Sequence, residues 1–140
     1  MFNPEREVPN LELCKKLKEL GFPQDGGGFY WVIENINGKE LPRVVYESDI
    51  DNGEFGTKFV VEIIKAPTIR ELGEWFPLTD EVLSCRFIDE WLLYWEKRHN
   101  PNVFYNSHGK IEAEARADLL VWLVENGYVN FKKGVKENEA

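Results

Sequence analysis

The fold is decided by the stretch Phe29-Tyr-Trp-Val-Ile-Glu-Asn35 and by the pair Asn37-Gly38 that follows it. The stretch is rich in β-branched and aromatic residues and is too short for a free-standing helix, so it predicts a strand. Asn-Gly is a strong hairpin signal, because a type I′ turn needs two residues that tolerate positive φ. We therefore expect a return strand through about residues 43–48. Pro42 lacks an N–H and suits the start or the edge of that strand.

Three other segments predict helices. The first begins after Asn10, whose side chain can cap it, and ends at Gly21. The second is short and begins at the capping box Thr68-Ile-Arg-Glu71. The third runs from about residue 112 to residue 126 and ends at Gly127, because glycine readily takes the left-handed conformation that closes a helix.

Further strands are expected in the middle of the chain. Residues 58–65 carry Phe59, Val61 and Ile63 on one face and Val60, Glu62 and Ile64 on the other, and so indicate a central strand. Residues 80–99 fit either a hairpin, with strands at 82–87 and 91–96, or a helix capped by Thr79. We favour the hairpin, because a helix here would be apolar nearly all round, which is unusual at a surface.

Together these elements predict an α+β fold. The expected order is α-β-β-β-α-β-β-α, with a mainly antiparallel sheet of about five strands packed by three helices. Residues 100–110 carry Asn, Pro, Ser and Gly and predict an exposed loop. A chain of 140 residues has the usual size of one domain. We place that domain at residues 1–131 and expect residues 132–140 to form a frayed tail.

The composition disfavours several classes of partner. The chain has 25 acidic and 17 basic residues and a formal net charge of −8, with no cluster of basic residues. Direct binding to nucleic acid or to an anionic membrane needs such a cluster, so neither is expected. No apolar run approaches the about 20 residues of a membrane helix, and the start lacks a secretory pattern. Cys14 and Cys85 then indicate reduced, buried thiols, and we expect the cytoplasm.

Three phrases occur in order along the chain. They are residues 13–24 (Leu-Cys-Lys-Lys-Leu-Lys-Glu-Leu-Gly-Phe-Pro-Gln), residues 66–77 (Ala-Pro-Thr-Ile-Arg-Glu-Leu-Gly-Glu-Trp-Phe-Pro) and residues 119–128 (Leu-Leu-Val-Trp-Leu-Val-Glu-Asn-Gly-Tyr). Together they resemble small uncharacterised proteins encoded by phages and prophages in bacterial genomes. The resemblance spans most of the chain and implies an α-β-α-β-α order and a mobile-element setting. It implies no activity, cofactor or catalytic residue.

Three patterns invite a chemical interpretation, and each has a simpler one. Residues 49–54 resemble the start of a calcium loop, but the sixth position, where the loop needs glycine, holds Glu54, and the twelfth, where it needs glutamate, holds Val60. A solvated connector is therefore favoured. Residues 25–28, Asp-Gly-Gly-Gly, lack the ending of a phosphate-binding loop, which favours simple flexibility. His99 and His108 match no zinc spacing with the two cysteines. We expect no metal, no cofactor and no catalytic residue.

The third helix carries a second apolar stripe. Trp122 lies on the side away from the expected core, with Leu119 and Ala115 beside it. Such a stripe is either buried between layers of the same chain or forms a contact with another chain, a homodimer included. In the second case Trp122 is the favoured anchor, because tryptophan is enriched among the residues that dominate interfaces.

Three hypotheses of function from different classes follow. The leading one is a non-catalytic phage accessory protein that acts through protein–protein contacts at Trp122, Leu119 and Ala115. The second is an acidic protein that binds or inhibits a basic, nucleic-acid-associated protein, steered by the net charge of −8. The third is a small-ligand-binding domain or enzyme whose site is assembled only in space.

Overall fold

The computed structural model describes residues 3–51, 59–76, 81–86, 90–97, 100–131 and 135–136. For residues 51, 81–86, 101 and 135–136 it describes the backbone alone. The described elements form an α+β fold, which confirms the predicted class. In chain order they are η1 (Pro4–Arg6), α1 (Leu11–Leu20), β1 (Phe29–Ile36), β2 (Lys39–Tyr46), α2 (Glu47–Asp51), β3 (Val60–Lys65), α3 (Ile69–Gly73), β4 (Glu81–Arg86), β5 (Trp91–Lys97), β6 (Asn100–Gly109), α4 (Glu112–Glu125), β7 (Val129–Asn130) and β8 (Val135–Lys136).

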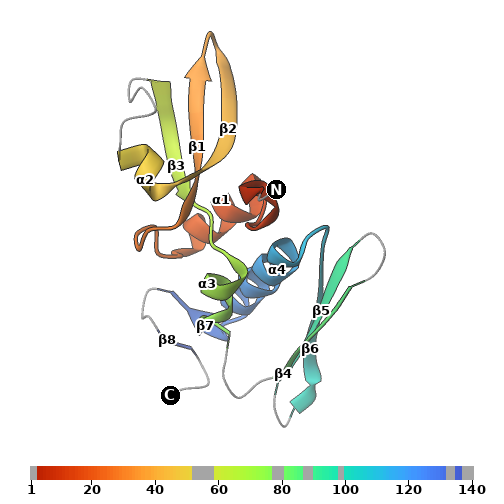
Figure 1. The fold of residues 1–140 in the computed structure, drawn as a ribbon. Coiled ribbons are helices and arrows are strands. Elements are labelled where there is room, and N and C mark those ends of the chain that lie inside the picture. The colour runs from red at the N-terminus through yellow and green to blue at the C-terminus, as the bar shows by residue number, and fades with distance from the viewer. Residues whose placement is uncertain are drawn as a thin grey trace.

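The strands do not form the single sheet of about five strands that we expected. Among the described residues they form an antiparallel sheet in the order β2-β1-β3, a second in the order β4-β5-β6, and the pair β7-β8. The two larger sheets lie at opposite ends of the molecule, with α1, α3 and α4 between them (Figure 1). Each of the two larger sheets is built from three consecutive strands. β3 nevertheless pairs with β1 and not with its sequence neighbour β2, so it lies at an edge of its sheet and not, as expected for residues 58–65, at the centre.

The predicted first hairpin is confirmed. Asn37 and Gly38 have φ of 54° and 82°, as a type I′ turn requires, and they join β1 to β2 in a register that pairs Ile36 with Lys39. Pro42 lies on the outer side of β2. Glu47 N–H donates to Gly28 O, and in an antiparallel pair every second residue directs its N–H to the partner strand. Counting back along β2 from Glu47, the odd-numbered residues therefore face β1, and Pro42 directs its backbone nitrogen away from it. Its missing N–H therefore costs the ladder nothing.

The helix α1 contributes to two hydrophobic cores. Its N-cap is confirmed, since Asn10 Oδ1 accepts from Leu13 N–H at 2.9 Å, and Gly21 ends it with φ of 103°. Leu17 packs with α3, α4 and β5 in the larger core. Cys14, one turn away, packs with Ile33 and Ile64 of the first sheet. The first sheet is thus held to the rest of the molecule through this helix.

The second sheet confirms the hairpin favoured for residues 80–99 and corrects the prediction for residues 100–110. β4 pairs with β5 in an antiparallel register, from Glu81 opposite Glu96 to Arg86 opposite Trp91. β6 (Asn100–Gly109) is a strand and not an exposed loop, and it pairs with the other side of β5. Its side chains alternate, with Ser107 buried towards α4 and Phe104 exposed. Ser107 Oγ donates to Ala115 O at 2.9 Å, so a polar residue is accommodated in the core.

The remaining elements are short. α2 was not predicted, and it follows β2 directly. Of the expected tail, Val135–Lys136 forms β8, which pairs with β7, and residues 132–134 and 137–140 lie outside the described part of the chain. The single domain at residues 1–131 stays a prediction. Within the described residues no helix has the length and apolar character needed to span a bilayer.

Candidate functional site

The second apolar stripe of α4 lies inside the chain. Ala115 and Leu119 are fully buried in the larger core. Trp122 is half-buried, and its ring stacks on Tyr105 and Tyr128 with centroid distances of 4.8 and 5.8 Å. Of the two alternatives for this stripe, burial within the chain therefore holds for Ala115 and Leu119, because β5 and β6 cover this side of the helix. A contact surface formed by all three residues is thereby corrected.

Among the residues that the structure describes, those of the hypothetical metal sets are not brought together. No group of three or more His, Cys, Asp or Glu side chains suited to a metal occurs among the described residues. His108 is exposed and lies 3.6 Å from Glu90 Oε1. Cys14 is a buried free thiol that donates to Pro9 O, and burial raises its pKa to about 12. His99, residues 52–54 and the side chain of Cys85 lie outside the description.

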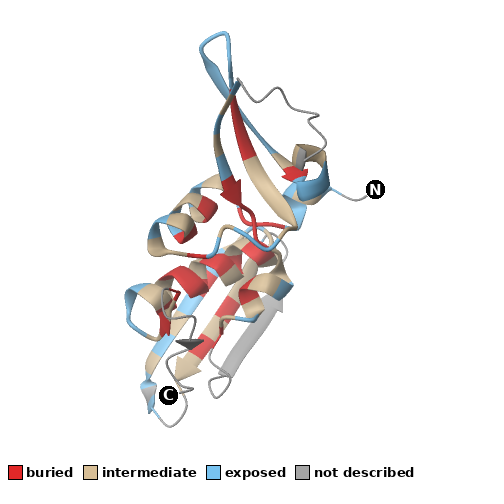
Figure 2. Cartoon of the chain, turned by 90° about the vertical axis from the view of Figure 1, so that its left-hand side faces the viewer, coloured by how far each residue is buried: buried red, intermediate tan, exposed pale blue. Residues whose placement is uncertain are grey.

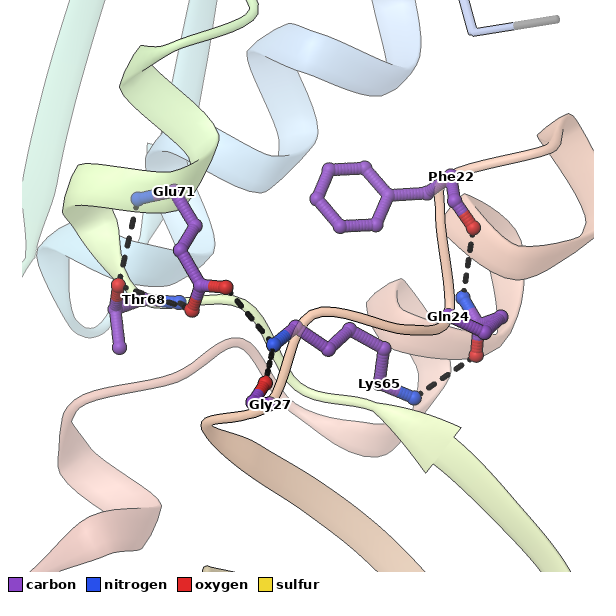
Figure 3. A network of polar contacts seen from close by, with 6 residues as sticks. All are labelled: Phe22, Gln24, Gly27, Lys65, Thr68 and Glu71. Atoms are coloured by element: carbon purple, nitrogen blue, oxygen red, sulfur yellow. Dashed lines mark hydrogen bonds and ion pairs between the residues drawn. The ribbon is translucent and has the colours of Figure 1, made fainter. Parts of the chain in front are cut away.

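The glycine-rich loop binds a lysine of the same chain. Gly26, Gly27 and Gly28 all have positive φ, of 95°, 77° and 87°. The loop wraps the ammonium group of Lys65, which donates to Gly27 O and pairs with Glu71 Oε2 at 2.8 Å (Figure 3). A Cβ on Gly28 would lie only 3.0 Å from Lys65 Nζ, and the φ of 87° also favours glycine at this position. These glycines thus have a defined conformational role that the interpretation as simple flexibility missed.

Lys65 joins three segments of the chain. Its side chain is 2% exposed, and a buried ammonium group needs such partners to offset its lost hydration. Its backbone N–H donates to Gln24 Oε1 at 2.9 Å, and Gln24 Nε2 donates to Phe22 O. Glu71 also completes the predicted capping box with Thr68, which is confirmed. We call Gly27, Lys65 and Glu71 the lysine clasp; it attaches the end of β3 to the glycine loop and to α3.

A partly buried hydrogen bond between side chains also joins β6 to α4. Tyr105 Oη donates to Asp118 Oδ2 at 2.9 Å. Burial raises the pKa of Asp118, an effect that the Tyr105 hydrogen bond and the nearby His108 partly oppose. Burial, together with this hydrogen bond, raises the pKa of Tyr105 to about 12. The pair holds the strand against the helix.

A further candidate surface is the end of the first hairpin. We call residues 34–43 the hairpin arm. β3 pairs with β1 no further than Glu34, and the arm projects beyond the body of the molecule (Figure 1). Residues 35–43 are all exposed, as the pale blue tip in Figure 2 shows. The large apolar side chains among them are Ile36, 39% exposed, and Leu41, 48% exposed.

The register places these apolar residues on one face. Glu34 lies opposite Leu41, and residues directly opposite in an antiparallel pair share a face. Ile36 is two residues from Glu34 along β1, and Arg43 is two residues from Leu41 along β2, so both lie on the same face. An open hollow of about 300 Å³ lies at this face, lined by Glu34, Ile36, Leu41, Pro42 and Arg43.

Sequence reasoning had not singled out the arm. The signal was present, because Asn37-Gly38 sets the register and a period of two then places Glu34 and Ile36 beside Leu41 and Arg43. What the sequence did not indicate is that β3 pairs with β1 and begins opposite Glu34, and the exposure of the arm depends on that pairing.

Comparisons of the chain with protein families, with curated proteins and with solved structures find no match.

The lysine clasp predicts that Gly28 and Gly73 respond in opposite ways to alanine. Gly28→Ala should lower the free energy of unfolding by at least about 1–2 kcal/mol, because φ is positive and the methyl group meets Lys65. Gly73 lies in α3 with open space at its Cβ, so Gly73→Ala should be neutral or stabilise by up to about 1 kcal/mol. Urea unfolding of the two variants measures this; equal effects would contradict the clasp.

The Tyr105–Asp118 pair predicts a pH-dependent stability. The pKa of Asp118 is raised in the folded chain above its ordinary value of 3.8, so the folded state binds more protons and loses stability as pH rises through the window above 3.8. Asp118→Asn keeps an acceptor but does not titrate. Urea unfolding at several pH values should therefore show this variant gaining stability relative to the original chain as pH rises. The opposite slope would contradict the assignment, and Glu5→Gln, at an exposed position, serves as control.

Proposed function

We propose that the chain is a non-catalytic accessory protein that binds another protein through the hairpin arm. The observation that carries this is the exposure of Ile36 and Leu41 on one face of a projecting hairpin. Single exposed apolar residues are ordinary, but neighbouring ones on a projecting element favour an interaction surface. Ile63, 40% exposed and opposite Val32, extends the same face towards the body of the sheet.

The energy available at this face suits a protein contact. Complete burial of one aliphatic side chain contributes about 1.5–3 kcal/mol, so the partly exposed Ile36, Leu41 and Ile63 together offer several kcal/mol. The edges of the sheet are less suited to pairing with a partner strand. Pro42 offers no N–H on the outer edge of β2, and the register shift near Glu34 disturbs β3. The face is therefore favoured over the edges.

Three buried or partly buried ionisable groups support a non-catalytic reading, because each of them holds elements of the fold together. Lys65 is bound by Gly27 and Glu71 in the lysine clasp. Asp118 accepts from Tyr105 between α4 and β6. Cys14 donates to Pro9 beneath the first sheet, and its raised pKa disfavours the reactive thiolate.

We place this contact in the cytoplasm of a bacterium that carries a phage or prophage. The mobile-element setting rests on the resemblance of residues 13–24, 66–77 and 119–128. The compartment rests on the composition and on the free thiol of Cys14, which suits a reducing environment.

The proposal predicts that Leu41→Ser and Ile36→Ser, singly or together, abolish capture of a partner from a lysate of the host. Both substitutions lie at exposed positions, so the stability of the chain should change by no more than about 0.5 kcal/mol. Capture on immobilised chain followed by mass spectrometry is the measurement, with thermal unfolding of each variant alongside.

The matched control is Phe104→Ser. Phe104 is 50% exposed, close to the 48% of Leu41, but lies on β6 of the second sheet. It should leave capture unchanged. A partner that binds the doubly substituted arm as well as the original chain, or that is lost only with Phe104→Ser, would refute the arm as the contact surface.

A further inference from the structure

The hollow on the hairpin arm contains a carboxylate in an unusual position. The side chain of Glu34 is 12% exposed, although its strand neighbours on the arm are exposed. Ile36 and Leu41 line the same hollow. Burying a carboxylate among apolar side chains is costly unless hydrogen bonds and opposite charge offset the lost hydration.

The described residues satisfy this carboxylate only in part. Arg43 Nη2 lies 3.3 Å from Glu34 Oε1, and this ion pair is the single polar contact of Glu34 that the described part of the chain provides. A carboxylate has two oxygens with about four acceptor sites. The side chain of Arg43 is itself 53% exposed, so water screens its charge. Glu34 therefore retains acceptor capacity towards the hollow.

We propose that the partner inserts a basic side chain, an arginine in preference to a lysine, into this hollow, where it binds Glu34. This inference rests on the proposed function of the arm and names the chemistry of the partner. A guanidinium group forms two parallel hydrogen bonds with a carboxylate, which a lysine does not. Its methylene stem packs on Leu41 and Pro42 while the head reaches the charge.

The size and the charge of the chain agree with this occupant. A hollow of about 300 Å³ is at the lower limit of small-molecule sites, about 300–1,000 Å³, and suits one side chain. The net charge of −8 attracts a basic partner at long range. The same charge opposes docking of a second copy of the chain, since two copies repel each other, so a foreign basic protein is favoured over a homodimer.

The test uses N-acetyl-arginine amide as a probe of the isotopically labelled full chain by nuclear magnetic resonance. We expect saturable shifts of the amides of Glu34, Ile36, Leu41 and Arg43. The uncharged citrulline analogue should produce none of them. No saturable shift with the arginine probe up to its solubility limit, or shifts spread over other acidic positions, would overturn the proposal.

Two variants are expected to change the affinity for the arginine probe in opposite directions. Glu34→Gln should weaken binding of the probe by about tenfold or more, because it removes the charge from the acceptor. Arg43→Gln should strengthen binding, because it removes the competing cation. Glu40→Gln removes the same unit of charge as Glu34→Gln from an exposed position and should change binding less than about twofold. Equal weakening of probe binding by Glu34→Gln and Glu40→Gln would overturn the proposal.

Capture of the natural partner separates this inference from the proposed function. If Leu41→Ser loses the partner and Glu34→Gln keeps it, the arm stands as the contact surface and the basic side chain is refuted. If both variants keep the partner, the proposed function itself is refuted. Sedimentation of the free chain completes the test by measuring its oligomeric state. If the free chain is a dimer and Glu34→Gln dissociates it, the occupant of the hollow is a second copy of the chain, and the proposal of a foreign partner is overturned.

Discussion

The two-residue turn at Asn37-Gly38 is the constraint on which the account of this molecule depends. With positive φ at both residues it admits one register of β1 and β2, and that register brings Glu34 and Leu41 opposite each other. A slip of one residue would exchange the two faces of the strand, placing Ile36 and Leu41 on different sides of the sheet. The turn therefore determines both the hairpin and the composition of its exposed face.

The base of the hairpin is attached to the rest of the molecule by polar and apolar contacts, whereas its end is exposed. The lysine clasp attaches the end of β3 to the glycine loop that precedes β1, and Glu71 extends this attachment to α3. α1 adds the apolar part, with Cys14 beneath the first sheet and Leu17 in the larger core. A rigid base and a projecting end suit an element that presents side chains to a partner without reorganising, which lowers the entropic cost of binding.

Local signals in the sequence predicted most elements, and long-range arrangement was not predictable from them. Asn10, Gly21 and the Thr68–Glu71 capping box act on their own neighbours and were interpreted correctly. β6 was missed because its Asn, Pro and Ser residues resemble a loop, whereas β5 supplies a ladder and Ser107 finds a partner in α4. The face of the arm follows from register and periodicity, but its exposure depends on the pairing of β3 with β1, which begins at Val60 opposite Glu34, and no local pattern indicates this pairing.

Amide hydrogen exchange of the chain, alone and with its captured partner, tests the central claim most directly. In the free chain Glu40 directs its N–H away from β1 and should exchange quickly. The account predicts that the partner slows exchange within residues 34–43 and leaves β6 and α4 unchanged. Slowed exchange confined to the second sheet or to α4, with the arm unaffected, would contradict the claim that the hairpin arm is the binding surface.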